Sequence, residues 1–107
     1  MRTLPLKTIR SWGLATMSNF YIISFDPNLA DTATLHEYIK NSSKYLNWWH
    51  YLSSAYIVKT NDNLAGVQAD LQRNWPSNRY FIVKIDPRYY DGWINNEAYQ
   101  WFRDNVN

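Results

Sequence analysis

The chain has 107 residues, a formal net charge of +2 and no cysteine. This length allows one domain with its own core, and the lack of cysteine excludes a disulfide framework, a thiolate metal site and a cysteine nucleophile. So small a charge does not by itself indicate a nucleic-acid partner, whereas six Trp and nine Tyr residues are typical of a filled core or of an interface.

The first sixteen residues carry Arg2, Lys7 and Arg10 and no acidic residue. They lack the continuous apolar stretch of a signal peptide, and no apolar run in the chain is long enough to cross a membrane. We therefore expect residues 1–16 to be a poorly packed extension and residues 17–107 to form one domain of a cytoplasmic protein. The alternative for the extension is a basic arm that grips phosphates.

The apolar run FYIISFD, residues 20–26, predicts a strand that is buried on both faces. Asp26 ends this strand, and Pro27 stops it because proline has no N–H to donate to a neighbouring strand. A carboxylate at the end of a rigid central strand is well placed to bind a metal. It is equally well placed to cap a loop by accepting backbone N–H groups.

A helix is predicted near residues 32–42, because apolar residues recur there at helical spacing. The candidates for the cap at its start are Asp31, Thr32 and Thr34. Thr34 forms a capping-box pattern with Glu37. Strands are predicted near 45–52 and 54–60. The short polar pair Ser53 and Ser54 between them indicates a hairpin.

A second helix is predicted near residues 62–75, where apolar residues form a stripe, with Asn61 or Asp62 as its cap. A fourth strand near 79–85 ends at Asp86 and Pro87, which repeats the exit of the first strand. A short last helix follows, and its cap is Asn95 or Asn96. The aromatic segment beyond the fourth strand offers more apolar surface than one small sheet needs, so we predict a homodimer.

The order β-α-β-β-α-β predicts an α+β protein with a ferredoxin-like fold, a four-stranded antiparallel sheet with two helices on one face, followed by an extra C-terminal helix. In this topology the first strand lies between the third and the fourth. Asp26 is then expected at the same end of the sheet as Ser54 and Arg79, with His50 one strand further out. Asp86 is expected at the opposite end, so the two Asp-Pro exits do not form one carboxylate pair within a chain.

The sequence WWHYLSSAYIVKT, residues 48–60, and the later GWINNEAYQWF, residues 92–102, are similar to small Cas2-like proteins. The resemblance covers roughly residues 19–102 and is closest to the group labelled SinR-family proteins, which are relatives of the CRISPR adaptation protein Cas2 and of VapD-type toxins. It implies a ferredoxin-like fold, a homodimer and an association with DNA or RNA. It also implies a metal-dependent endonuclease in which Asp26 from each subunit holds Mg²⁺ or Mn²⁺. Phe25 and Pro27 depart from the family pattern around this Asp.

Other side chains have chemistry that fits such an activity. His50 is a candidate general base, because histidine exchanges protons near neutral pH. A lone histidine is more often a packed or surface residue, and no second histidine is expected near His50, since His36 falls on the first helix. Arg79, Lys59 and Lys84 are candidate contacts to a phosphate backbone. The alternative to a nuclease is a non-catalytic module that binds a protein or a small nucleotide through its aromatic surface.

Overall fold

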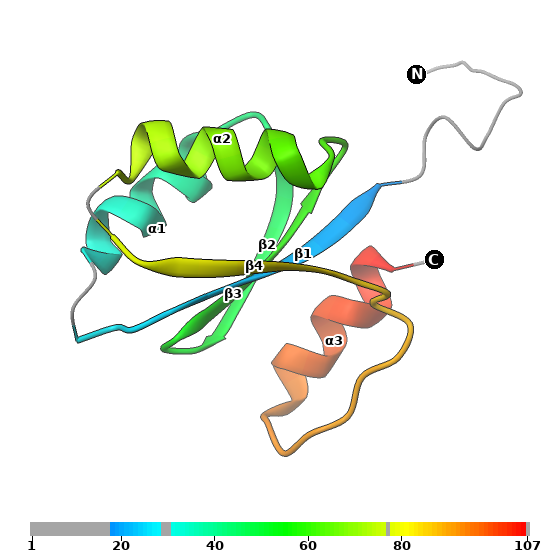
Figure 1. Cartoon of the computed structure of the whole chain (residues 1–107). Coiled ribbons are helices and arrows are strands. Elements are labelled where there is room, and N and C mark those ends of the chain that lie inside the picture. The colour runs from blue at the N-terminus through cyan, green and yellow to red at the C-terminus, as the bar shows by residue number, and fades with distance from the viewer. Residues whose placement is uncertain (1–17, 29–30, 77, 107) are drawn as a thin grey trace, which may run out of the picture.

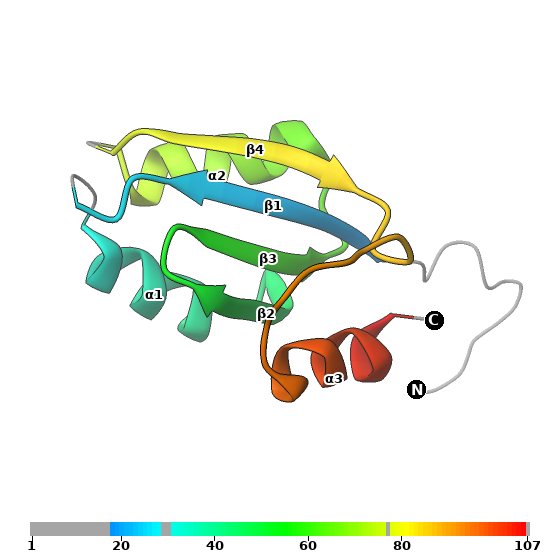
Figure 2. The same ribbon diagram turned by 90° about the horizontal axis from the view of Figure 1, so that it is seen from below.

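The computed structural model describes residues 18–28, 31–76 and 78–106. The elements in chain order are β1 (Asn19–Phe25), α1 (Thr32–Asn41), β2 (Tyr45–Leu52), β3 (Ala55–Thr60), α2 (Leu64–Asn74), β4 (Tyr80–Ile85) and α3 (Asn96–Asn105). The four strands (Figure 1) form one antiparallel sheet in the order β2-β3-β1-β4, which Figure 2 shows side by side. The α+β class is confirmed, and every predicted helix and strand exists. The predicted extension, residues 1–16, lies outside the described residues.

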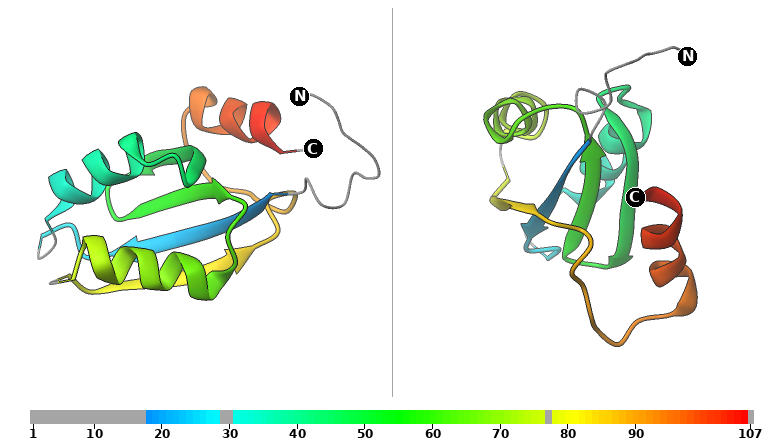
Figure 3. Two further views of the ribbon diagram at one scale, coloured as in Figure 1. Left: turned by 90° about the horizontal axis from the view of Figure 1, so that it is seen from above. Right: turned by 90° about the vertical axis from the view of Figure 1, so that its right-hand side faces the viewer.

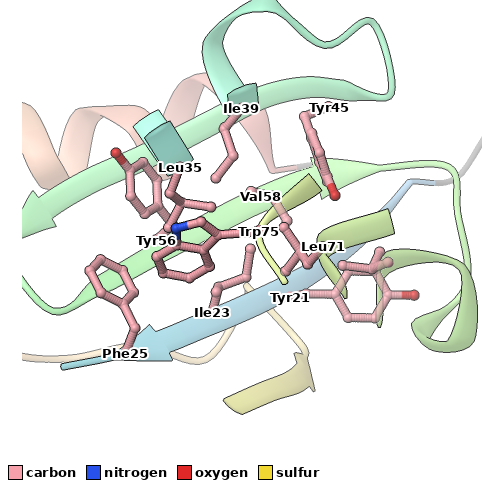
Figure 4. Close-up of a cluster of buried hydrophobic side chains, with 11 residues drawn as sticks. Tyr21, Ile23, Phe25, Leu35, Ile39, Tyr45, Tyr56, Val58, Leu71 and Trp75 are labelled. Atoms are coloured by element: carbon pink, nitrogen blue, oxygen red, sulfur yellow. The ribbon is translucent and has the colours of Figure 1, made fainter. Parts of the chain in front are cut away.

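The sheet is covered on both faces, by α1 and α2 on one side and by α3 on the other (Figures 2 and 3). β1 is central, and its side chains alternate between the two layers. Tyr21, Ile23 and Phe25 pack under α1 and α2 (Figure 4), whereas Phe20 and Ile22 pack toward α3. The apolar run of residues 20–26 was predicted to be a strand buried on both faces, and β1 has side chains in the core on both sides of the sheet.

The helix starts are fixed by three side-chain caps. Asp31 accepts a hydrogen bond from the Thr34 N–H at 3.1 Å, which makes Asp31 the cap of α1. Asn95 caps α3, as one of the two predicted candidates. The predicted cap of α2 is wrong: Asn63 Oδ1 accepts the Gly66 N–H at 2.8 Å, and α2 begins only at Leu64.

α3 covers only part of the second face of the sheet. Its Trp101 and Phe102 pack with Trp49 and Phe20, and the Trp49 indole donates to the Ala98 carbonyl at 3.1 Å. Trp101 and Phe102 are thus buried within the chain itself, whereas Tyr89, Tyr90 and Trp93 before α3 stay exposed. The aromatic segment beyond β4 is therefore buried in its helix and exposed in its loop.

Candidate functional site

Asp26 lies at one end of the central strand. The pairing of Ser24 with Ala55 and of Phe25 with Tyr80 places it beside Ser54 and Arg79, as the topology predicted. It is exposed, and its Oδ1 accepts the Asn28 N–H at 2.9 Å across the turn that contains Pro27. The capping role considered for Asp26 is therefore present, formed by one of its two carboxylate oxygens.

Asp86 lies at the opposite end of the sheet, because Ile85 pairs with Phe20 at the start of β1. It accepts the Arg88 N–H at 3.1 Å, the Arg88 Nε at 2.9 Å and the Arg88 Nη2 at 2.6 Å. The Arg88 hydrogen bonds lower the pKa of Asp86 to about 2. The six-residue step from Phe20 to Asp26 separates the two ends by about 20 Å of extended chain, so the two carboxylates do not share a site.

His50 is held against Tyr56 on the face of the sheet that carries α1. The two rings stack with centroids 4.0 Å apart and planes at 5°, and His50 Nδ1 lies 3.0 Å from the Ala55 carbonyl. A carbonyl only accepts, so Nδ1 carries the hydrogen and Nε2 of the neutral ring is the basic nitrogen. No hydrogen bond joins His50 to Asp26 in the described parts of the chain.

The expectation that His50 has no histidine near it is wrong. His36 of α1 has its ring centroid 6.3 Å from that of His50, and its Nδ1 lies 2.7 Å from the Tyr56 hydroxyl. Burial raises the pKa of Tyr56 to about 12, so this hydroxyl keeps its proton at neutral pH. α1 crosses over β2 and β3 here, and a contact between elements this far apart in sequence leaves no local pattern that could reveal it.

Asp70 is a buried acidic residue that the sequence reading missed. It is 2% exposed and accepts hydrogen bonds from the Tyr38 hydroxyl at 2.5 Å and the Tyr45 hydroxyl at 2.8 Å. Burial, and then the bond to Asp70, raises the pKa of Tyr45 far above its usual value. The available signal was its position beside Leu71 on the apolar stripe of α2, where a carboxylate needs partners.

A cleft of about 450 Å³ opens where β1 begins and β4 and α3 end. We call it the basic cleft, because Lys59, Lys84 and Arg88 line it. Lys59 Nζ donates to the Asn105 carbonyl at 2.9 Å at the end of α3, and Arg88 is paired with Asp86. Lys84 has no ion pair with any residue that the structure describes.

The structure divides the predicted site residues into two groups. Asp26 and Arg79 lie at one end of β1 and β4, while Lys59 and Lys84 lie at the other. Across residues 18–28, 31–76 and 78–106, no group of three or more His, Asp or Glu side chains is arranged to hold a metal ion. None of the helices described in those ranges has the length and apolar character needed to cross a membrane.

Comparison of the chain with protein-family models, with curated proteins and with solved structures gives no match.

Proposed function

We propose that this protein is a Cas2-like, ferredoxin-like homodimer that binds nucleic acid through the basic cleft. The strand order β2-β3-β1-β4, with α1 and α2 together on one face, supports the ferredoxin-like assignment. The basic cleft is the observation that carries the functional part. It gathers three cationic side chains against one acidic side chain, although the chain as a whole has a net charge of only +2.

The cleft has the chemistry of a phosphate site. Lys84 is unpaired among the described residues, so it can approach a phosphate without first breaking an ion pair. Lys59 Nζ lies over the Phe20 ring, 5.9 Å from its centroid, and both residues line the basic cleft. Phosphate contacts of this kind bind DNA or RNA without reading sequence, and their strength falls as salt rises.

The test is fluorescence anisotropy with labelled single-stranded and double-stranded oligonucleotides over a series of salt concentrations. We expect Lys84→Ala and Arg88→Ala each to weaken binding and to lower the salt slope by about 1. Lys40→Ala is the matched control, because Lys40 is an exposed lysine in the last turn of α1, away from the cleft. Equal losses in all three variants, or no binding at low salt, would contradict a phosphate site in the cleft.

A second candidate function, metal-dependent cleavage, follows from the free oxygen of Asp26. Only Oδ1 takes part in the turn, and Oδ2 makes no hydrogen bond within the described ranges. Mg²⁺ is usually held by one or two carboxylates with waters and substrate phosphates. One chain supplies Asp26 alone, so a shared site would need Asp26 of both subunits, with Arg79 contacting phosphate and His50 as the base.

The cleavage candidate is tested by Asp26→Asn, measured with Mg²⁺ and with Mn²⁺. Asparagine keeps the oxygen that accepts the Asn28 N–H, so we expect an unchanged melting temperature together with a loss of cleavage. The control is Asp91→Asn, since exposed Asp91 also accepts a neighbouring N–H, from Gly92 at 2.8 Å. Cleavage that survives Asp26→Asn would leave Asp26 as a turn cap only.

The remaining alternative is a non-catalytic module for a small nucleotide or a protein. The cleft volume of about 450 Å³ falls within the range of small-molecule sites. Isothermal titration with a mononucleotide separates this alternative from nucleic-acid binding. A mononucleotide that binds tightly, with oligonucleotides binding no better, would favour a small ligand; affinity that grows with oligonucleotide length would favour the polymer.

A further inference from the structure

β4 is an edge strand whose outer side is open. Nothing in residues 18–28, 31–76 or 78–106 pairs with that side, and the strand keeps one uninterrupted register with β1. Tyr80 and Ile82 pack toward α1 and α2, so by alternation Phe81 and Val83 project from the other face. They are 68% and 39% exposed. A regular edge strand with exposed apolar side chains is a template for pairing with another chain.

The opposite edge of the sheet differs in both respects. β2 changes register against β3 at two places, between Tyr45 and Asn47 and between Trp49 and Leu52. Such irregularities bend an edge strand and hinder its pairing with other chains. α3 also packs on β2, where the Asn47 amide donates to the Asn105 side chain at 2.7 Å. β4 carries neither protection, so pairing is expected at β4 and not at β2.

The sequence of β4 fits a second copy of itself. A two-fold axis perpendicular to the sheet makes the two strands antiparallel and leaves each residue on its own face. Directly opposite residues of two paired strands point to the same face of the sheet. This holds for two copies of β4 only if one residue lies opposite its own copy, so the two-fold axis must pass at a residue and not between two residues. With the axis at Ile82, Phe81 lies opposite Val83 of the second copy, and Tyr80 lies opposite its Lys84. An axis at Val83 would instead set Ile82 against Lys84.

We propose that β4 pairs with β4 of a second copy about a two-fold axis at Ile82, so that one antiparallel sheet runs through both subunits. Each Phe81 then covers a Val83, and the exposed apolar surface of the edge becomes shared surface. The proposal rests on the homodimer of the proposed function and identifies its interface.

Single cysteines test the register directly, because the chain has no cysteine of its own. Opposite Cα atoms in an antiparallel pair lie about 4.5–5.5 Å apart, within the roughly 4.4–6.8 Å that a disulfide spans. Ile82→Cys should therefore form a covalent dimer under mild oxidation, seen on a non-reducing gel. Val83→Cys should form far less, since the two Val83 positions are offset along the strands. Leu46→Cys, at an exposed site on the other edge, is the control.

Sedimentation equilibrium separates this interface from the homodimer itself. Phe81→Lys sets a lysine against Val83 twice, so we expect the dimer dissociation constant to rise about tenfold or more, and Leu46→Lys to leave it unchanged. A wild-type chain that stays monomeric at high concentration would overturn both the homodimer and this interface. A stable dimer that ignores Phe81→Lys, or that cross-links at Val83 or Leu46 and not at Ile82, would overturn this interface alone.

Discussion

Removal of one hydroxyl from the buried Asp70 cluster should measurably destabilise the fold. Tyr45→Phe deletes the donor that lies 2.8 Å from Asp70 Oδ2 and leaves the aromatic ring in place. Asp70 is only 2% exposed, so water cannot replace the lost donor. Tyr38, Asn74 and the Arg73 guanidinium, 3.6 Å from Asp70 Oδ1, are then the remaining partners of the carboxylate among the described residues. Hydrogen bonds to charged groups contribute about 1.5–3 kcal/mol, so we expect the free energy of unfolding to fall by about 2 kcal/mol.

Urea denaturation followed by circular dichroism measures this loss, and thermal melting should show a drop of roughly 8 °C. Tyr51→Phe is the control, because Tyr51 is on the same strand but 41% exposed, and its hydroxyl makes no hydrogen bond to another described residue. It should change stability by less than about 0.5 kcal/mol. A double-mutant cycle of Tyr45→Phe with Asp70→Leu isolates the pair, and we expect the two changes to be strongly non-additive.

Two results would refute this reasoning. If Tyr45→Phe is as mild as Tyr51→Phe, the hydroxyl does not stabilise the carboxylate in the folded state. If the effects of Tyr45→Phe and Asp70→Leu simply add, the two side chains contribute independently, and the cluster is ordinary packing. Either outcome would mean that the short distance from Tyr45 to Asp70 does not reflect an energetic contact.

Two further predictions concern alkaline pH and a helix cap. The pKa of Tyr56 is raised to about 12 and that of Tyr45 further still, so the protonated forms of both side chains favour the folded state. Stability should be intact below the ordinary tyrosine pKa of 10.0 and fall as pH rises through about 10 to 12. The ultraviolet phenolate absorbance of these two tyrosines should appear only as the chain unfolds. Early absorbance from every tyrosine at about pH 10 would contradict this. Asn63→Ala should cost about 1 kcal/mol in urea denaturation, while Asn61→Ala should cost little, and the reverse ranking would return the α2 cap to Asn61.

The helices and strands could be predicted from the sequence because the patterns that define them lie within single segments. The apolar run of β1 and the stripe of α2 each follow from spacing within one segment, so their boundaries fall within about two residues of those observed. The cap of α2 was missed because Asn61, Asp62 and Asn63 are adjacent polar residues with equal capping chemistry. Asn63 is selected by its extended backbone directly before Leu64, the first residue of α2.

The candidate site was less predictable because its contacts join distant segments. His36 and His50 are brought together by α1 packing over β2, and Asp70 meets Tyr38 and Tyr45 only after both helices dock on the sheet. By contrast, the separation of Asp26 from Asp86 followed from strand order alone. Strand order therefore predicted the ends of the sheet at which these two carboxylates lie, but it carries no information on which side chains touch between layers.

The β4 interface and a metal shared by two Asp26 residues make opposite predictions about geometry. Ile82 pairs with Ile23 of β1, and Asp26 follows Ile23 by three residues, which is about 10 Å of extended strand. β1 is also one strand further from the two-fold axis than β4. The strand spacing and the rise per residue together place the two Asp26 carboxylates of the dimer about 25 Å apart. Two ligands of one Mg²⁺ lie within a few ångströms of each other. A disulfide-linked Ile82→Cys dimer should therefore show no cleavage that requires both Asp26 residues. If that linked dimer cleaves as fast as its reduced form and Asp26→Asn abolishes the cleavage, one Asp26 is sufficient for the metal. If cleavage returns only on reduction, the nuclease and the β4 dimer are different assemblies of the same chain.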